Sequence, residues 1–139
     1  MTHTERIRVA YVDTDASGRI HFTAALRYFE IAGHALERLL FDGRLAQEVD
    51  IAGFPRADVR AQYLDALEAG DEILVTAWVE KVGRTSVTFG FEGSRESGTA
   101  CLTGSIVAVA IDGEGRPTPL TTTLRWGFES AARERRVND

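Results

Sequence analysis

Residues 13–40 read DTDASGRIHFTAALRYFEIAGHALERLL, a polar loop followed by a long amphipathic segment. The polar residues of this segment fall mostly on one side of a helix, and the apolar residues recur with helical spacing on the other. The polar set is Arg27, Glu30, Glu37 and Arg38, and the apolar set from Phe22 onward is Ala25, Leu26, Phe29, Ala32, Leu36, Leu39 and Leu40. The sequence therefore predicts a half-buried helix over Phe22–Leu40, about 28 Å long at 1.5 Å per residue, and no second helix of that length.

The rest of the chain has the alternation and the turn residues that are typical of strands. The predicted strands are Arg6–Val12 before the helix and Ala57–Leu67, Ile73–Val82, Thr85–Phe91 and Ala100–Ile111 after it. The connections between the last four strands are short, which predicts antiparallel hairpins. We expect the charged tail, Ala131–Asp139, to form only a frayed helix. The prediction is one α+β domain, residues 1–139, with an antiparallel sheet wrapped around one long helix.

The composition indicates an ordinary globular chain. Of its 139 residues, 44% are hydrophobic and 27% are charged, which excludes disordered and fibrous classes. The longest purely aliphatic run, Ile106–Ile111, is far shorter than the ~20 apolar residues that span a bilayer. The segment Met1–Arg6 has no features of a secretory signal. We therefore expect a cytoplasmic protein that binds no membrane.

Charge and cysteine content exclude further classes. The net charge is −5, with 21 acidic and 16 basic residues, so a general attraction to nucleic acid is not expected. Every basic residue except Lys81 is arginine, whose planar guanidinium suits phosphate groups. Cys101 is the only cysteine, which excludes an internal disulfide and a thiolate zinc site.

A sheet covered by a single helix leaves one face and its edge strands open. Exposed strand edges present unpaired backbone groups that pair readily with another copy of the chain. The sequence therefore predicts a homodimer or a homotetramer.

The loop before the helix is the most informative stretch for chemistry. It places Asp13 and Asp15 next to a helix N-terminus, whose free N–H groups can hold a developing oxyanion while a carboxylate acts on the carbonyl. That combination suits acyl transfer. The alternative is that the aspartates only cap the loop or the helix. Further carboxylates that would complete a metal site are not suitably spaced, so we expect neither a metal nor a cofactor.

Several motifs resemble one known family. Asp15-Ala16-Ser17-Gly18, followed by Leu26-Arg27-Tyr28-Phe29-Glu30, is similar to the signature of the 4-hydroxybenzoyl-CoA thioesterase family of hot-dog proteins. Further similar stretches are Gly53-Phe54-Pro55, Tyr63-Leu64 with Gly70-Asp71-Glu72, and Gly115-Arg116-Pro117-Thr118-Pro119-Leu120. The resemblance covers roughly residues 5–128. It implies a hot-dog fold and an acyl-CoA thioesterase that acts on a small or medium acyl or aroyl thioester.

The resemblance also implies roles for individual residues. Asp15 matches the catalytic carboxylate, a nucleophile or a general base, and the backbone N–H of Phe22 matches the oxyanion donor. Gly53 matches a glycine that lines the acyl site, and Arg84, Thr85 and Ser86 match the region that binds coenzyme A. Asp13 matches a structural aspartate. His21 borders the helix start and is a further candidate. This chain departs from the family pattern at His21-Phe22, where relatives often carry Tyr-His, and at Ala24-Ala25, where they carry Asn-Tyr.

Alternatives remain open at this level. Hot-dog folds also serve as non-catalytic acyl-thioester binding proteins, and the acyl carrier of an enzyme can be an acyl carrier protein instead of coenzyme A. A hot-dog dehydratase or hydratase would need a paired histidine and acid, for which His21 is the one candidate histidine. Arg56 and Arg60 are further candidates for phosphate contacts, or they are simply solvated surface residues.

Overall fold

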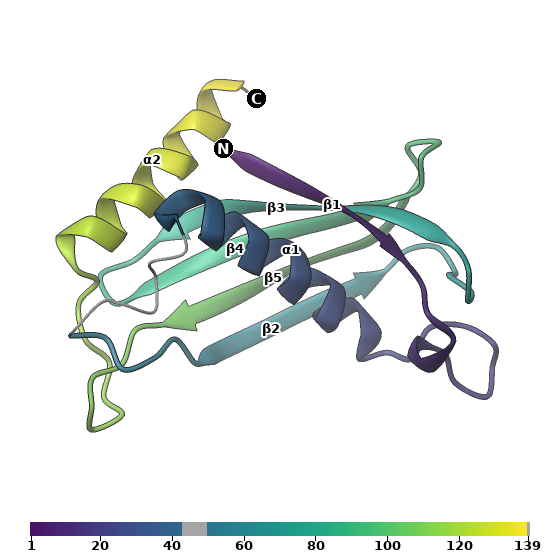
Figure 1. Ribbon diagram of the computed structural model, residues 1–139, viewed down its shortest axis with the longest axis horizontal. Coiled ribbons are helices and arrows are strands. Elements are labelled where there is room, and N and C mark those ends of the chain that lie inside the picture. The colour runs from purple at the N-terminus through teal and green to yellow at the C-terminus, as the bar shows by residue number, and fades with distance from the viewer. Residues whose placement is uncertain (43–49, 139) are drawn as a thin grey trace.

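A computed structural model describes residues 1–42 and 50–138 of the chain. Its elements, in chain order, are β1 (Thr2–Arg8), the short 3-10 helix η1 (Tyr11–Asp13), α1 (Ala24–Phe41), β2 (Arg56–Tyr63), β3 (Glu72–Val82), β4 (Ser86–Ser94), β5 (Ala100–Val109) and α2 (Thr122–Asn138). The five strands form one antiparallel sheet in the order β1-β3-β4-β5-β2. Helix α1 lies across one face of this sheet (Figure 1). The predicted α+β class, with an antiparallel sheet around a long helix, is confirmed.

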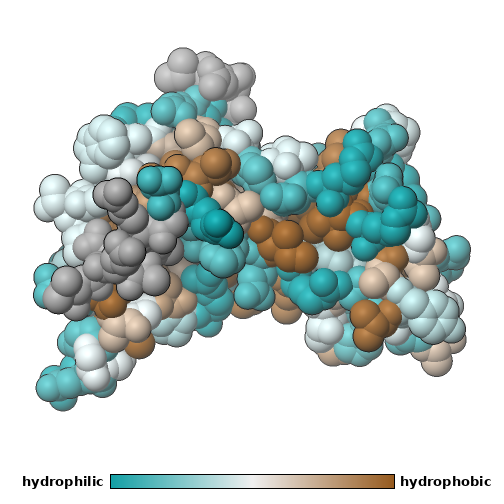
Figure 2. All heavy atoms as spheres, in the orientation of Figure 1, coloured by the Kyte–Doolittle hydropathy of each residue, from teal (hydrophilic) through white to brown (hydrophobic). Residues whose placement is uncertain are grey.

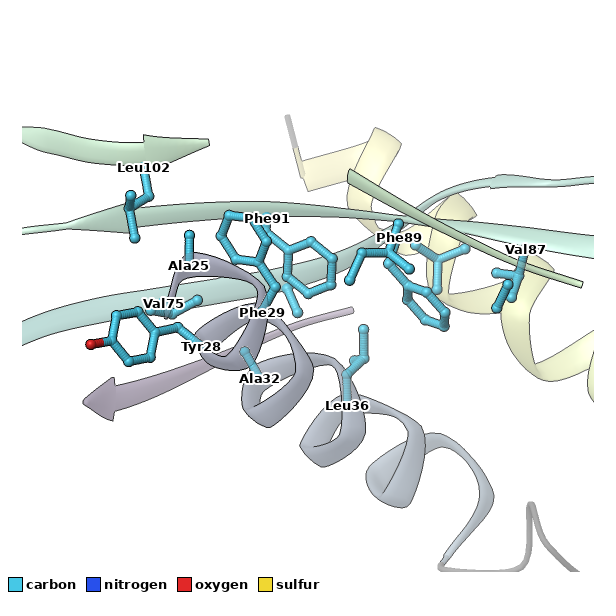
Figure 3. Packing of buried hydrophobic residues seen from close by; sticks show 14 of the residues in the cluster. Ala25, Tyr28, Phe29, Ala32, Leu36, Val75, Val87, Phe89, Phe91 and Leu102 are labelled. Carbon is cyan, nitrogen blue, oxygen red and sulfur yellow. The ribbon is translucent and has the colours of Figure 1, made fainter. Parts of the chain in front are cut away.

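The apolar stripe of α1 packs on the inward face of the sheet. Its buried residues Ala25, Phe29, Ala32 and Leu36 point toward side chains from β3, β4 and β5 (Figure 3). The ring of Phe29 stacks on Phe91 of β4, with the ring centroids 4.8 Å apart and the planes 13° from parallel. This packing fixes where α1 crosses the sheet, and therefore where its N-terminus lies.

A second long helix, α2, covers the end of the same sheet face beyond α1 (Figure 1). Its residues Leu124, Phe128 and Ala131 are buried, and Phe128 meets Phe41 of α1 edge to face, with the ring centroids 4.9 Å apart. The prediction of a single long helix, with only a frayed helix in the tail, is therefore wrong. Gly127 lies within this helix and weakens its sequence signal. In the fold, however, the missing side chain lets the Phe41 ring pack directly on the helix backbone.

The first strand occupies Thr2–Arg8 instead of the predicted Arg6–Val12. Just after it, the carboxylate of Asp13 accepts a hydrogen bond from the Ala10 N–H at 3.0 Å, which turns the chain into η1. Tyr11 and Val12 are left pointing into solvent, with 87% and 85% of their surface exposed. Their β-like alternation in the sequence therefore did not reflect burial in the sheet.

The strand β2 ends at Tyr63, four residues before the predicted end at Leu67. The guanidinium of Arg95, from the β4–β5 connection, donates hydrogen bonds to the Asp65 carboxylate at 3.1 Å and to the Ala66 carbonyl at 2.6 Å. These contacts tie the segment after β2 to the β4–β5 connection, where its regular strand pairing ends. β4 runs on to Ser94, beyond its predicted end.

Hydrophobic groups reach the surface in several places on the face that carries α1 (Figure 2). Among the exposed large hydrophobic residues are Phe22 before α1, Ile31 and Leu39 on α1, and Val59 and Tyr63 on β2. Within the described residues, no helix is long and apolar enough to cross a membrane.

Candidate active site at the start of α1

The loop between η1 and α1 is shaped mainly by main-chain hydrogen bonds. The Asp15 N–H donates to the Arg19 carbonyl at 3.0 Å, the Gly18 N–H donates to the Asp15 carbonyl at 3.0 Å, and the His21 N–H donates to the Asp13 carbonyl at 2.7 Å. Gly18 has a φ of 80°, a left-handed conformation that glycine adopts without strain. The loop therefore holds Asp15 through its backbone.

Asp13 anchors this loop to α1. Only 6% of its surface is exposed, and its carboxylate accepts hydrogen bonds from the Tyr28 hydroxyl at 2.8 Å, from the Ala10 N–H at 3.0 Å and from the Arg27 guanidinium. Burial raises the pKa of Asp13, but the hydrogen bonds from Tyr28, Ala10 and Arg27 together hold that pKa below its ordinary value. Every oxygen of this carboxylate is already engaged, which fits a structural role.

Asp15 is exposed and differs from Asp13 in how its oxygens are used. Its Oδ1 accepts hydrogen bonds from the Ser17 N–H at 2.8 Å and from the Ser17 hydroxyl at 2.5 Å. No donor among the described residues reaches Oδ2. The two bonds from Ser17, helped by nearby His21, lower the pKa of Asp15, so the side chain is ionised at neutral pH. One oxygen is thus fixed and the other is free to act.

The free oxygen belongs to a residue that lines a surface cleft of about 410 Å³. One wall comes from the loop and the start of α1, and the other from the segment after β2; the lining residues are Asp15, Ser17, Arg19, Ile20, Phe22, Tyr63, Leu64, Asp65, Ala66 and Leu67. A hydrogen bond from the Ile20 N–H to the Leu67 carbonyl, at 3.0 Å, ties the two walls together.

Phe22 lies in the turn just before α1 and lines the same cleft as Asp15. Its side chain is 71% exposed, and no acceptor among the described residues pairs with its backbone N–H. An unpaired N–H at a helix start carries a partial positive charge and can hold an anion or a polarised carbonyl oxygen. The structure thus places the two predicted catalytic residues, Asp15 and Phe22, along one cleft.

His21 faces the helix start. Its Nδ1 accepts a hydrogen bond from the Thr23 N–H at 3.3 Å and lies 2.9 Å from the Thr23 hydroxyl. In this arrangement Nδ1 is occupied by the turn that leads into α1, and the ring stacks at an angle against Phe22 with centroids 4.5 Å apart. The side chain therefore supports the turn that presents the Phe22 N–H.

Arg19 and Tyr63 are two of the cleft residues that were not among the predicted site residues. Arg19 is exposed, lines the cleft, and makes no side-chain ion pair within the described part of the chain. Tyr63 closes the β2 side of the cleft. Partial burial raises the pKa of its hydroxyl, and the Ala25 backbone N–H has the smaller, opposite effect on that pKa. Tyr63 belonged to a motif that pointed to the family, but its position at a strand end, where it reaches the cleft, could be seen only in the fold.

The remaining predicted residues lie at the other end of the sheet. Arg84, Thr85 and Ser86 follow the end of β3, whereas the cleft adjoins its start; the 11 residues of β3 span about 36 Å at ~3.3 Å per residue. Gly53 lies near them. It pairs with Ile111, and the N–H of the preceding residue, Ala110, donates a hydrogen bond to the Thr85 carbonyl. Within one chain these four residues do not share a cleft with Asp15.

The other two arginine candidates have acidic neighbours. Arg60 donates to Asp58 at 2.9 Å, and Arg56 forms an ion pair with Glu37, with 3.7 Å between Nη2 and Oε1. Glu37 itself is buried, although the helical pattern placed it on the polar side of α1. In the part of the chain that the structure describes, no group of three or more His, Cys, Asp or Glu side chains is arranged to hold a metal ion.

Comparison with known proteins extends these observations. The family model of the thioesterase superfamily matches residues 17–102. No curated protein sequence is significantly similar to the chain. A 1,4-dihydroxy-2-naphthoyl-CoA thioesterase from Synechocystis has a similar structure, with a TM-score of 0.80 at 20% identity over 92% of this chain and 96% of that chain. A thioesterase from Thermus thermophilus, solved in complex with coenzyme A and Zn, gives a TM-score of 0.79 at 25% identity over 94% of each chain.

The family match covers more than half of the chain, from the loop that precedes α1 to β5. It includes Phe22, Gly53 and Arg84, and it begins two residues after Asp15. The arrangement of one antiparallel sheet around α1 is also that of the similar thioesterase structures. The chain belongs to the thioesterase superfamily and has its hot-dog fold.

Proposed function

We propose that the protein hydrolyses acyl-CoA thioesters in the cleft at the start of α1. The observation that carries this proposal is the pairing, in one cleft, of an ionised carboxylate that has a free oxygen with an unpaired helix-start N–H. The similar structures support the substrate class, since one was solved with coenzyme A and another is a 1,4-dihydroxy-2-naphthoyl-CoA thioesterase.

In the proposed reaction the Phe22 N–H donates a hydrogen bond to the thioester carbonyl oxygen and stabilises the negative charge that develops on it. The free oxygen of Asp15 acts on the carbonyl carbon, either by direct attack or by taking a proton from a water molecule that attacks. The C–S bond then breaks and coenzyme A leaves as a thiolate. When water attacks, the thiolate takes up the proton that Asp15 removed; when Asp15 attacks directly, a water molecule hydrolyses the acyl–Asp15 anhydride, releases the acid and supplies the proton. Ser17 keeps Asp15 ionised and in position for either route.

Coenzyme A carries phosphate groups, and a chain of net charge −5 needs local cations to bind them. Arg19 lines the cleft and Arg84 lies at the far end of the sheet, and neither guanidinium makes an ion pair within residues 1–42 and 50–138. We assign Arg19 to the phosphates within the same chain. Arg84, with Thr85, Ser86 and Gly53, would serve a neighbouring copy.

That assignment requires a dimer through the edge strand β2. One side of β2 pairs with β5 and the other is open, and its residues Val59 and Tyr63 are 41% and 42% exposed. Antiparallel pairing of two β2 strands sets the start of one strand against the end of the other. Gly53 and Arg84 of one copy are thereby moved toward the cleft of the other, and a dimer or tetramer is the functional form.

The catalytic role is tested by Asp15→Asn. Asparagine has nearly the same shape and keeps its hydrogen-bonding ability, but it cannot act as a nucleophile or base, so kcat should fall ~10²–10⁴-fold. Asp50→Asn, the same change at an exposed residue away from the cleft, serves as the matched control. Calorimetric titration should show that Asp15→Asn still binds an acyl-CoA. Hydrolysis at near wild-type rate by this variant would remove Asp15 from the mechanism, and acyl-CoA binding without hydrolysis by the wild type would favour a binding protein.

The shared site is tested by mixing two impaired variants, assayed at an acyl-CoA concentration at which the Arg84→Ala protein turns over slowly. Asp15→Asn and Arg84→Ala homodimers are unfolded and refolded together, so that mixed dimers form. A mixed dimer has one site with both changes and one with neither, and about a quarter of wild-type activity returns if copies pair at random. Light scattering should show a particle larger than the 15.3 kDa monomer. No recovery on mixing would place Arg84 outside the site.

A further inference from the structure

The turn between β3 and β4, residues 83–86, is held through its carbonyl groups. Arg125 of α2 donates hydrogen bonds from Nη2 to the Gly83 carbonyl and to the Arg84 carbonyl, each at 2.9 Å. The Leu120 N–H adds a third hydrogen bond, to the Arg84 carbonyl at 3.0 Å. Among the described residues, Arg125 is the only donor to the Gly83 carbonyl. The guanidinium of Arg125 therefore fixes the orientation of that peptide group.

Holding these two carbonyls also orients two N–H groups. In a trans peptide the C=O and the following N–H lie in one plane and point in opposite directions, and no peptide bond in the described ranges is cis. The Gly83 carbonyl shares its peptide group with the Arg84 N–H, and the Arg84 carbonyl shares one with the Thr85 N–H. Because Arg125 binds both carbonyls from the α2 side, both N–H groups point away from α2.

The turn carries several hydrogen-bond donors that the chain itself does not use. No described residue accepts a hydrogen bond from the N–H of Arg84 or Thr85, and none pairs with the hydroxyls of Thr85 and Ser86. The Arg84 side chain is exposed and makes no ion pair within residues 1–42 and 50–138. N–H groups, hydroxyls and a guanidinium are the groups that bind phosphate. The turn is therefore suited to a phosphate group as long as its two peptide groups keep their orientation.

Arg125 is held in place by its own helix. It lies in the first turn of α2, beside the β3–β4 turn (Figure 1). Its Nη1 donates to the Glu129 carboxylate at 3.1 Å, one helical turn further on, and only 34% of the side chain is exposed. Hydrogen bonds that are partly shielded from water are stronger than fully solvated ones. Arg125 lies outside residues 17–102, the segment that the family model matches, so that match assigns it no role.

We propose, resting on the function proposed above, that Arg125 is a positioning residue for coenzyme A. It holds the β3–β4 turn in the orientation in which Arg84, Thr85 and Ser86 meet a phosphate group of the coenzyme A bound to a neighbouring copy. Arg125 acts through the turn and does not touch the phosphate, because Nη1 is engaged by Glu129 and Nη2 by the two carbonyls. Helix α2, which has no part in the chemistry, thereby sets the affinity for coenzyme A.

The test uses Arg125→Met, which keeps the apolar stem of the side chain and removes the guanidinium. With an acyl-CoA as substrate, KM should rise about threefold to thirtyfold, because the competent turn is less populated, while kcat changes by less than about twofold. The same acyl group carried on pantetheine, which lacks the phosphates, should show an unchanged KM. Calorimetric titration with coenzyme A alone should show the same rise in Kd. Arg125→Lys, which keeps a charged donor, should lie between the wild type and Arg125→Met.

Arg133→Met is the matched control. Arg133 lies on the same helix and also pairs with Glu129, at 4.0 Å, but within the described chain it donates no hydrogen bond to the β3–β4 turn. Arg133→Met should therefore leave KM and Kd unchanged. Melting curves at one protein concentration confirm that the variants fold, and Arg125→Lys carries the same comparison if Arg125→Met does not fold.

Dependence on the turn is measured in the Arg84→Ala background. There Arg125→Met should raise KM by a smaller factor than it does alone, because the turn has lost a group that Arg125 positions. An unchanged KM and Kd in Arg125→Met, an equal rise in KM for the acyl-CoA and the pantetheine thioester, or fully additive effects with Arg84→Ala would each overturn the role of Arg125. The thioesterase proposal would stand in all three cases.

Failure of the proposed function gives different results. If the wild type hydrolyses no acyl-CoA but binds coenzyme A with a Kd that rises in Arg125→Met, the proposed hydrolysis is wrong and the positioning role of Arg125 stands. If the wild type neither hydrolyses an acyl-CoA nor binds coenzyme A, the proposed function and the role of Arg125 are both refuted.

Discussion

The hydrogen bond between Tyr28 and Asp13 gives a quantitative test of how the loop that carries Asp15 is anchored. Tyr28 is fully buried, and its hydroxyl donates to the Asp13 carboxylate at 2.8 Å. In Asp13→Ala the hydroxyl loses its acceptor in a place that water does not reach, which costs about 1–3 kcal/mol. The other two donors, Ala10 N–H and the half-exposed Arg27, can be hydrated, so each adds only about 0.5–1.5 kcal/mol.

The free energy of unfolding should therefore fall by about 2–6 kcal/mol in Asp13→Ala, out of about 5–15 kcal/mol for a typical domain. Tyr28→Phe should cost about 1 kcal/mol, because Asp13 keeps two donors. The double variant no longer carries an orphaned hydroxyl, so its loss should be smaller than the sum of the two single losses by about 1–2 kcal/mol.

Urea unfolding, followed by circular dichroism, measures all four proteins. Each is used at the same protein concentration, because oligomer formation makes apparent stability depend on concentration. Losses that add to within about 0.5 kcal/mol would show that the Tyr28 hydroxyl and Asp13 act independently, and would refute the anchoring role.

Three further outcomes follow from contacts described above. Because the pKa of Asp13 is lowered in the folded state, its stabilisation is present at neutral pH and lost on acidification, so the difference in unfolding free energy between wild type and Asp13→Asn should shrink below about pH 4 in urea titrations. Gly104→Ala should lower that free energy by about 1–3 kcal/mol, because the new methyl group collides with the Phe29 ring, and unchanged melting would contradict this packing. Arg95→Ala frees the cleft wall at Ala66 and should raise KM for acyl-CoA more than it lowers kcat in steady-state assays; a change in kcat alone would contradict a role in shaping that wall.

The parts of the fold that sequence could predict are those set by local pattern. The stripe of α1 and the polar loop before it depend on neighbours within a few residues, and both lie where expected. The second helix depends on a distant contact, since Gly127 is unfavourable in an isolated helix and is tolerated only because Phe41 packs against it. Pattern alone could not supply that contact.

The site residues also divide into those set by local sequence and those set by distant contacts. Asp15 and Phe22 are close in sequence, and their shared cleft could be expected from a strand end followed by a helix start. The burial of Glu37 could not be expected from the sequence. Helical periodicity assigns a residue only to the apolar or the polar side of α1, and Glu37 is covered by β2, which follows later in the chain. Arg84 was assigned by resemblance alone, and only the sheet topology shows that it lies far from Asp15 within one chain.

The main-chain construction of the loop that carries Asp15 has a consequence for how such an enzyme can diversify. Its geometry comes from the backbone bonds between Asp15, Gly18 and Arg19 and from the bond between Ile20 and Leu67, so Ala16 can be replaced without moving the carboxylate. A mutant library randomised there would change the surface of the loop while keeping the position of the Asp15 carboxylate. A second cavity, beside Glu37 between α1 and β2, is built from other elements and could be varied in a separate library. The loop and the cavity would then be independent targets for mutagenesis.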